Sequence, residues 1–314
     1  MSNILVIGGG TGSYTILRGL KRYTNNLTAI VSMFDSGGST GRLRDELGYL
    51  PPGDVRNCIL ALAPEDNNTE ILRSLLAYRF ENGNGLSGHS MGNLLLTALK
   101  AITKDEVLAI EKLSKILGLK GRVIPVTIDN SNLCAELENG EIIRGETNID
   151  IPKHDGNLKI KKLFLDPPAN ALIDAIEAIQ NADKIIIGPG DLYSSLIANL
   201  SVKGIPEAIK SSKAKKIYVC NVMTKHGETT NYRASDFLKE IEKYLGENTI
   251  DVILCNTELG SEELLKKYVE EKSFPVEIDV ENLTKVQLLA GDFLNKANII
   301  RHDSMKLAKT IIDL

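Results

Sequence analysis

The sequence predicts an α/β fold, namely a Rossmann-like three-layer sandwich with a mostly parallel, doubly wound sheet and a β-rich extension in the middle of the chain. Two observations predict it. The chain opens with an apolar run at residues 3–7, a glycine-rich loop, a helical pattern and a second buried strand at 27–33. Apolar strands followed by glycine loops and helices return after residue 184. This alternation is typical of a parallel sheet covered by helices on both faces.

The first half of the chain is mostly helical after its second strand. In residues 13–23, Ile16, Leu17 and Leu20 fall on one face of a helix. A glycine-rich loop follows at 35–41. Helical spacing then recurs in four segments, at residues 55–63, 69–79, 92–102 and 105–117.

The middle of the chain has a different pattern. Four segments alternate like antiparallel strands, at residues 123–126, 133–137, 142–144 and 158–164. Asn139 and Gly140 form a hairpin signal between the second and third of them. Since no internal repeat or linker is visible, we interpret residues 122–165, approximately, as a β-rich insertion in a single domain that spans residues 1–314.

The second half repeats the opening pattern. Buried strands are expected at residues 184–187, 216–221 and 250–256, with a short last strand at 299–300. Helices are expected between and after them, at residues 172–179, 235–245, 261–268 and 303–312. A glycine loop at 188–195 separates the first of these strands from the next helix.

Composition narrows the function classes. Of the 314 residues, 43% are hydrophobic and 25% charged, with a formal net charge of -4, which is ordinary for a globular protein and unfavourable for a nucleic-acid binder. No signal-peptide pattern and no apolar run of membrane-spanning length is visible, so we expect a cytoplasmic protein without membrane insertion. The cysteines form no CxxC pair and the histidines are scattered. We therefore expect buried free thiols and no zinc site.

The first glycine loop, residues 8–12, follows a strand and opens a helix. Glycines let the backbone approach a phosphate, and the helix N-terminus supplies free N–H groups. The loop is neither a strict GxGxxG motif, since Ser13 or Thr15 stands at the third glycine position, nor a Walker loop. A dinucleotide stays open as a ligand, because an acid at the end of the second strand could bind a ribose. The residues of this loop expected to bind ligand are Gly9, Gly10, Thr11 and Gly12.

Further loops carry the same kind of residues. Hydroxyls, backbone amides and arginines of the second loop could hold phosphate oxygens. The expected ligand-binding residues there are Asp35, Gly37, Gly38, Ser39, Arg42 and Arg44. The segment 51–57 opens a helix and adds Asp54, Arg56 and Asn57, although Asp54 could equally be only an N-cap. The loop 85–93 adds His89 and Asn93, with a structural hydrogen-bonding role as the alternative for His89.

The second half contributes two more loops. The loop 188–195 adds Gly188, Gly190, Asp191, Tyr193 and Ser194. The loop 221–229 adds Lys225, and His226 of that loop could face the same crevice. Capping for Ser194 and plain solvent exposure for Lys225 are the alternatives. Because loops at the carboxyl ends of parallel strands meet in one crevice, we expect a single anion site built from several of them. A diphosphate between a nucleoside and a second group suits such a crevice.

Taken together, these motifs resemble the YvcK/CofD-like family, and more closely its YvcK branch of bacterial gluconeogenesis factors. The segments that carry the resemblance run nearly end to end, at residues 8–12, 35–44, 51–57, 85–93, 165–168, 188–195 and 221–228. The resemblance implies a Rossmann-like fold. In the CofD branch it implies transfer of a phospholactyl group from a guanosine diphosphate conjugate to the deazaflavin precursor Fo, with magnesium. In the YvcK branch it implies binding of UDP-sugars, notably UDP-N-acetylglucosamine, and roles in growth on gluconeogenic carbon sources and in cell shape.

One residue departs from the family pattern. The family loop usually reads Ala-Asp-Asp-Gly-Gly-Ser, whereas here Ser36 replaces the second acid. A hard cation prefers carboxylate oxygens. The loss therefore weakens the case for a magnesium-dependent transfer, although Asp35 alone could still hold a magnesium ion. No cofactor is firmly implied.

Three hypotheses follow. The leading one is a nucleotide-sugar binder without catalysis that regulates envelope synthesis, with a homodimer and envelope-synthesis regulators as expected protein partners. The second is a CofD-like transferase of a phosphorylated group, in which Asp35, Arg42, Arg44 and Lys225 would position and stabilise charge. The third is an NAD-dependent oxidoreductase, suggested by the first glycine loop and Asp35.

Overall fold

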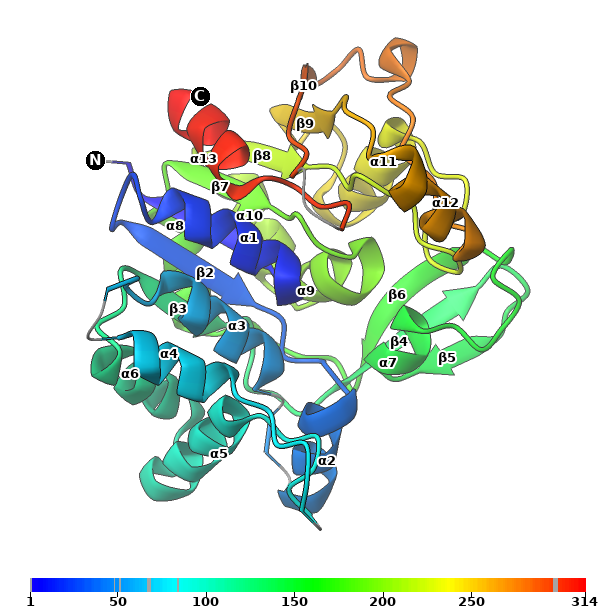
Figure 1. Ribbon diagram of the computed structural model, residues 1–314. Coiled ribbons are helices and arrows are strands. Elements are labelled where there is room, and N and C mark those ends of the chain that lie inside the picture. The colour runs from blue at the N-terminus through cyan, green and yellow to red at the C-terminus, as the bar shows by residue number, and fades with distance from the viewer. Residues whose placement is uncertain (1, 48, 51, 67–68, 84, 296–298) are drawn as a thin grey trace.

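A computed structural model describes residues 2–47, 49–50, 52–66, 69–83, 85–295 and 299–314. Seven parallel strands form the main sheet in the order β10-β9-β8-β7-β1-β2-β3 (Figure 1). Their bounds are β1 Ile4–Gly8, β2 Leu27–Val31, β3 Arg122–Pro125, β7 Lys184–Ile187, β8 Lys215–Val219, β9 Val252–Asn256 and β10 Gln287–Gly291. The chain builds outward from β1 on one side and from β7 on the other. This confirms the predicted doubly wound α/β fold and puts the switch point between β1 and β7.

Helices cover one face of the main sheet, and the first large cluster of buried hydrophobic residues lies between them and the sheet. Ile4 and Val6 of β1 point into it, as alternation along a strand requires. The helices that supply buried residues there are α1 Gly10–Leu20, α3 Gly53–Leu62, α4 Glu70–Ala77, α5 Met91–Thr103, α6 Glu106–Ile116 and α13 Ser304–Asp313. The helices α1 and α13, from opposite ends of the chain, pack side by side (Figure 1).

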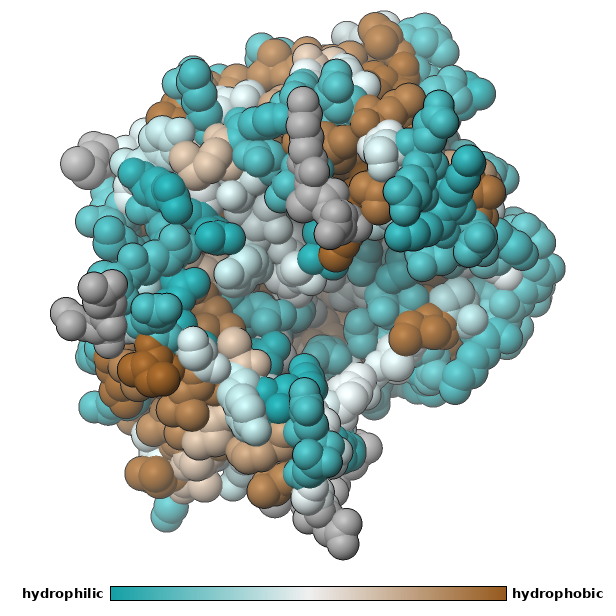
Figure 2. All heavy atoms as spheres, viewed as in Figure 1, coloured by the Kyte–Doolittle hydropathy of each residue, from teal (hydrophilic) through white to brown (hydrophobic). Residues whose placement is uncertain are grey.

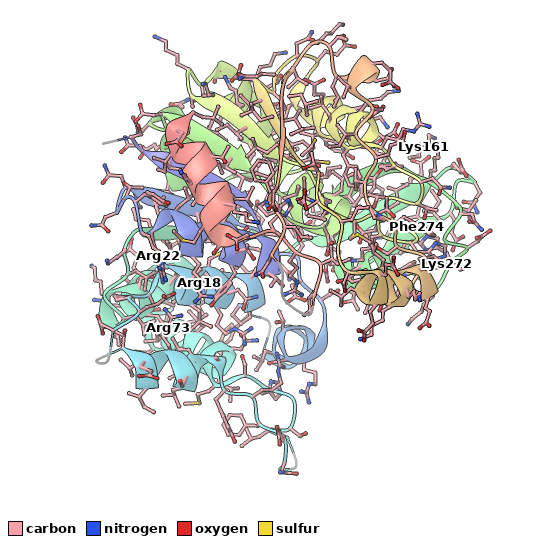
Figure 3. The ribbon with its side chains drawn as sticks, turned by 45° about the horizontal axis from the view of Figure 1, so that its top comes forward. Arg18, Arg22, Arg73, Lys161, Lys272 and Phe274 are labelled. Carbon is pink, nitrogen blue, oxygen red and sulfur yellow. The ribbon has the colours of Figure 1, made fainter. Side chains whose placement is uncertain are left out.

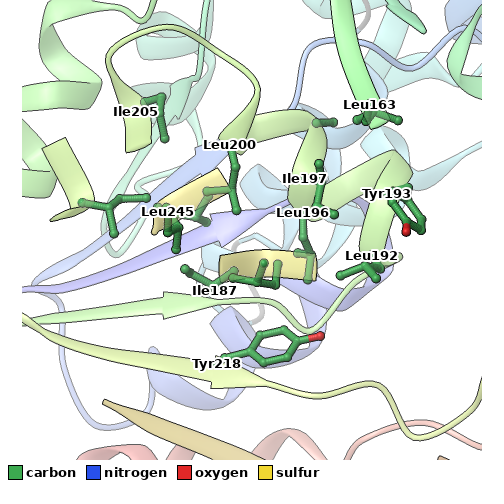
Figure 4. Close-up of a cluster of buried hydrophobic side chains, with 14 of the residues drawn as sticks. Leu163, Ile187, Leu192, Tyr193, Leu196, Ile197, Leu200, Ile205, Tyr218 and Leu245 are labelled. Carbon is green, nitrogen blue, oxygen red and sulfur yellow. The ribbon is translucent and has the colours of Figure 1, made fainter. Parts of the chain in front are cut away.

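The opposite face carries the second core cluster. Leu5 and Ile7 of β1 point into it. The elements that cover this face are α8 Ile173–Gln180, the π-helix η1 Leu192–Ile197, α9 Ala198–Leu200, α10 Ile205–Ser211 and α11 Ala234–Leu245. Figure 4 shows how η1 directs Leu192, Leu196 and Ile197 into this layer, against Ile187 of β7 and Tyr218 of β8. Burying a side chain of this size stabilises a fold by roughly 1.5–3 kcal/mol, so these contacts anchor the loops at the sheet edge.

A second, antiparallel sheet has the order β5-β4-β6, with β4 Asn132–Leu137, β5 Ile142–Arg144 and β6 Ile160–Asp166. Gly140, with φ of 86°, makes the predicted hairpin turn between β4 and β5. The expectation of an antiparallel strand at 123–126 is wrong, because β3 pairs in parallel with β2 in the main sheet. Its last three residues are buried, and such a fully buried strand carries no face alternation that reveals its partner.

Other differences concern the end of the chain and the helices outside the two layers. Residues 299–300 are not a strand, and the last strand is β10, whose side chains are only partly covered. The remaining elements are α2 Gly38–Leu47, α7 Glu146–Asp150, α12 Glu262–Glu270 and the 3-10 turn η2 Val280–Asn282.

The four cysteines are buried and free, as predicted. In the described part of the chain, no helix has the length and apolar character needed to cross a membrane.

Candidate functional site

A cavity of about 1070 Å³ lies at the switch point of the main sheet. Its walls come from the loops after β1, β2, β7 and β8, from the starts of α3 and α7, and from the segment before α13. Figure 2 shows a hollow near the middle of the face in view, surrounded mainly by hydrophilic and neutral surface. The predicted ligand-binding residues that line the cavity are Gly9, Gly10, Thr11, Gly12, Asp35, Asp54, Asn57, Gly190, Asp191, Ser194 and Lys225.

The first glycine loop presents the bare end of a helix to the cavity. Gly9 is the N-cap of α1, in extended conformation and without a side-chain cap, and the first turn holds no acidic residue. Gly10 has φ of 58°, a left-handed value that glycine adopts without strain. Backbone N–H groups and the positive end of the helix dipole therefore face the cavity, which favours an anion there.

The first glycine loop packs directly on the loop that follows β7. A Cβ atom at Gly12 would lie 2.5 Å from the carbonyl carbon of Pro189 and 2.9 Å from Cα of Gly190. Glycine is required at Gly12 because only hydrogen fits between the two backbones. The two loops thus form one continuous wall across the switch point.

Asp54 lies against the same helix end. Its position is the second residue of α3, whose N-cap is Pro52, so the expected N-cap role of Asp54 is wrong. The backbone N–H of Gly10 donates to its carboxylate. Burial, and then the neighbouring charge of Asp35, raise the pKa of Asp54 to about 7. An acidic side chain of this protein therefore already engages one of the amides that an anionic ligand would use.

The loop after β2 places Asp35 in the cavity and turns back on itself. The backbone N–H of Gly37 donates to Asp35 Oδ1 at 2.9 Å. Burial is the main cause that raises the pKa of Asp35 above its ordinary value. The Ser36 backbone N–H donates to Glu146 Oε2 at 3.3 Å, and its hydroxyl donates to Thr147 Oγ1 at 3.1 Å and accepts from the Thr147 N–H at 3.0 Å. Ser36 therefore ties this loop to α7.

Several predicted residues lie behind the cavity wall instead of lining it. Ser39, His89 and Asn93 are buried together, with Ser39 Oγ 3.0 Å from His89 Nδ1 and accepting from Asn93 Nδ2 at 3.3 Å. This network joins α2 to the start of α5. It agrees with the structural alternative for His89. Gly37, in the loop after β2, and Gly38, the first residue of α2, do not line the cavity either.

Two of the predicted arginines, Arg42 and Arg56, also lie outside the cavity. Arg42 donates to the carbonyl oxygen of Ser87 at 2.8 Å and so holds the loop 85–90. Arg56 donates to the Asn57 side chain at 2.9 Å and lies close enough to Asp35 and Asp54 to feel their charges. The side chain of Arg44 lies outside the described part of the structure. Within that part, neither Arg42 nor Arg56 lines the cavity.

Only some of the predicted residues in the loop after β7 line the cavity. Gly188, with φ of 85°, makes the turn, and Gly190, Asp191 and Ser194 reach the cavity. Tyr193 does not line the cavity and belongs to the cluster of buried side chains in Figure 4. Its ring is 1% exposed in the core, and its hydroxyl lies 2.8 Å from the hydroxyl of Tyr232. The structure therefore places Tyr193 in the core behind the site, because the wide turn of η1 directs it inward.

Lys225 stands at the centre of three carboxylates. Its Nζ is 3.3 Å from Asp191 Oδ2 and 2.9 Å from Glu228 Oε1, and it also forms an ion pair with Asp150. Burial alone would lower the pKa of Lys225, but Glu228, Asp191 and Asp150 raise it above its ordinary value. The ammonium is therefore charged at neutral pH and is held by protein groups.

The cavity is rich in acids with raised pKa values. Burial, followed by the charges of Asp35 and Asp150, raises the pKa of Glu146 to about 8. Burial also raises the pKa of Glu228 to about 8, although Lys225 opposes this. Several of these carboxyls consequently hold protons near neutral pH. This lowers the negative charge that a phosphate-bearing ligand would meet.

Sequence analysis missed a group of lining residues. They are Thr15, Glu146, Asp150, Asn221, Tyr268, Arg301 and His302, with others nearby. Glu146 and Asp150 lie on α7 inside the segment interpreted as β-rich, and Tyr268 and Arg301 lie outside any glycine loop. Asn221 stands in the loop that had been singled out for Lys225 and His226, and His226 does line the cavity.

Magnesium, which the resemblance implies for the CofD branch, fits one part of the cavity. In the loop after β2, Asp35 Oδ1 is engaged by Gly37 and Ser36 offers only a hydroxyl that is bound to Thr147. One carboxylate oxygen each from Asp150, Asp191 and Glu228, in contrast, lie within 4.8 Å of one another. Carboxylate oxygens are what a hard cation prefers. The fit is therefore on the Lys225 side.

A basic cluster lies on the outside of the molecule. Arg18 of α1, Arg22 of the turn after α1, and Arg73 of α4 gather on one side (Figure 3). Together with Lys21 they surround Glu65, at 3.0, 3.3, 3.8 and 3.2 Å respectively. Burial alone would raise the pKa of Glu65, yet hydrogen bonds and charge from Lys21 and then Arg18 lower it to about 2. This cluster fastens the loop after α3 to α1 and α4.

Comparison with known proteins agrees with this arrangement. The family model described as 2-phospho-L-lactate transferase CofD matches residues 4–294. The "Gluconeogenesis factor" of Bacillus subtilis is 42% identical over 315 residues, covering 99% of this chain and 97% of the relative. That of Halalkalibacterium halodurans is 45% identical over 315 residues, covering 99% and 96%. The crystal structure of protein BH3568 from Bacillus halodurans superposes with a TM-score of 0.93 at 44% identity, covering 99% of both chains.

Proposed function

The chain belongs to the CofD family, and from this premise we propose that it is a cytoplasmic gluconeogenesis factor that binds a nucleotide sugar of the UDP-N-acetylglucosamine type. In this proposal the bound form regulates envelope synthesis, and so cell shape, during growth on gluconeogenic carbon sources. The relatives named gluconeogenesis factor, similar over nearly their whole length, support the general role. The cavity supports the ligand class.

The observation that carries the ligand class is the wall made by two loops at the switch point. The uncapped N-terminus of α1 suits a diphosphate, and the loop of Gly190 closes against it. The cavity continues past this wall to carboxylates and to Asn221, which suit the hydroxyl and amide groups of a nucleoside and a sugar. Its volume of about 1070 Å³ leaves room for both ends of such a ligand.

Calorimetric titration tests the ligand class. We expect heat of binding with UDP-N-acetylglucosamine and UDP-glucose, and much weaker binding of NAD and GDP. Binding of NAD alone would reject the nucleotide-sugar proposal and favour the oxidoreductase hypothesis. A control titration with free N-acetylglucosamine shows how much of the affinity depends on the nucleotide.

A second candidate function is transfer of a phosphorylated group, as in the CofD branch. Asp54, Glu146 and Glu228, whose pKa values are raised to between about 7 and 8, are what favours it, because such values are suited to proton transfer. A bound divalent cation would supply stabilisation of phosphate charge. Release of nucleoside diphosphate or monophosphate from a bound conjugate, in the presence of candidate acceptors, would support transfer. Tight binding without release across all acceptors counts against it.

A further inference from the structure

Three acidic side chains converge at one side of the cavity: Asp150 and Asp191 line it, and Glu228 is buried and does not line it. Asp150 comes from the end of α7, Asp191 from the loop after β7 and Glu228 from the loop after β8. One oxygen from each carboxylate lies within 4.8 Å of the other two. Among the described residues, no other set of three acidic, histidine or cysteine side chains converges this closely. We refer to these three residues as the carboxylate triad.

The triad can carry more negative charge than its present partner neutralises. Three carboxyl groups face the single ammonium of Lys225. The side chain of Glu228 is 1% exposed, and no hydrogen-bond donor in the described structure reaches its Oε2. A buried carboxylate oxygen without a donor is costly. It is evidence, independent of the clustering, for a group that is bound there in another state of the protein.

Lys225 is placed so that it can leave the triad. Its side chain is one-third exposed toward the cavity, on a flexible four-carbon stem. The triad also lies close to the wall expected to bind phosphate. Asp191 directly follows Gly190, whose Cα would be 2.9 Å from a Cβ at Gly12. A ligand phosphate at the first glycine loop would therefore lie near both the triad and the lysine.

We propose that Asp150, Asp191 and Glu228 form a divalent-cation site in which Mg²⁺ or Mn²⁺ replaces the ammonium of Lys225 when a nucleotide diphosphate enters the cavity. The inference rests on the proposed nucleotide ligand. Three carboxylate oxygens, completed by water and phosphate oxygens, give the oxygen-only environment that these cations prefer. Lys225 then turns to the phosphate, where its positive charge is needed. The exchange adds positive charge to an acidic cavity at the moment an anion arrives.

Metal binding to the nucleotide-free protein is the first measurement. Titration of Mn²⁺ alone, followed by the loss of its free electron paramagnetic resonance signal, is expected to show one site. Asp191→Asn should lower the Mn²⁺ affinity at least tenfold. Asp150→Asn, which changes a partly exposed side chain, should lower it to the same extent and is the variant to use if Asp191→Asn does not fold. Glu263→Gln removes one exposed charge that does not line the cavity and is the matched control. Lys225→Met should raise the Mn²⁺ affinity because it removes the competing ammonium.

The second measurement separates this inference from the proposed function. UDP-N-acetylglucosamine is titrated in EDTA and in Mg²⁺, and we expect at least tenfold tighter binding in Mg²⁺, a gain that Asp191→Asn abolishes. Equal affinity in EDTA and Mg²⁺ overturns the cation site but leaves nucleotide-sugar binding intact. If no nucleotide binds in either buffer, the proposed function fails, and the Mn²⁺ titration then tests the cation site by itself. A single Mn²⁺ site that Asp191→Asn weakens supports the cation site. The absence of such a site overturns it.

Discussion

The affinity for a phosphate-bearing ligand should fall as pH rises from 6 to 8, because of Asp54. The Gly10 N–H at the start of α1 donates to the Asp54 carboxylate, and burial beside Asp35 raises the pKa of Asp54 to about 7. Below pH 7 the carboxyl is protonated and competes weakly with a phosphate. Above pH 7 it is an anion that holds the amide and repels the ligand.

The size of the effect follows from this pKa. If the ligand binds only when Asp54 is protonated, about nine-tenths of the molecules are competent at pH 6 and about one-tenth at pH 8. The dissociation constant should therefore rise about tenfold, which is about 1.4 kcal/mol. Glu146 and Glu228, with pKa values of about 8, add to the loss mainly above this range.

Asp54→Asn is the variant that tests the cause. It keeps the shape of the side chain but cannot ionise, so its affinity for UDP-N-acetylglucosamine, measured by calorimetry, should stay nearly constant between pH 6 and 8. Asp155→Asn, which changes an exposed turn residue, should keep the slope of the unaltered protein. A slope that survives in Asp54→Asn, or an affinity that rises with pH, would refute this reasoning.

Three further predictions concern single side chains. Gly12→Ala should abolish nucleotide binding, measured by calorimetry, because its methyl group overlaps the backbone of Pro189, whereas Gly291→Ala, with only ordinary contacts, should not. Tyr193→Phe should cost about 1 kcal/mol in denaturant unfolding through loss of a buried hydrogen bond, and leave nucleotide affinity unchanged; a large loss of affinity would return Tyr193 to the ligand-binding set. Glu65→Gln should cost about 1–2 kcal/mol at pH 7 after allowance for solvent screening. Since the pKa of Glu65 is depressed, this difference should disappear as pH falls from about 4.5 toward 2, and a difference that persists at pH 2 contradicts it.

The parallel core was predictable because its strands are short, apolar and followed by glycine loops. Residues 3–7 and 184–187 have this pattern, and they form the two strands at the switch point. The strand β10 was missed because its side chains are only partly buried and its apolar run, at residues 288–290, is short. The strand β3 was assigned to the wrong sheet because burial on both faces removes the signal that distinguishes its neighbours.

The parts of the candidate site that the backbone of the glycine loops forms could be predicted from the sequence, whereas the parts that depend on the direction of a side chain could not. Gly9, Gly10, Gly12 and Gly190 line the cavity, as their positions after strands indicate. Tyr193 does not, since only the π-helical turn sets its direction. Glu146 and Asp150 reach the cavity from a five-residue helix whose position depends on how the second sheet folds back. No local pattern in the sequence reports that geometry.

The contact between Gly12 and Pro189 joins residues from opposite halves of the sequence. The wall proposed to bind phosphate therefore does not exist in any amino-terminal fragment that ends before β7 has paired with β1. During synthesis, the ribosome must release well over half of the chain before this wall can close. A ligand held there cannot assist the folding of the first half, and its binding reports that the two halves have already come together.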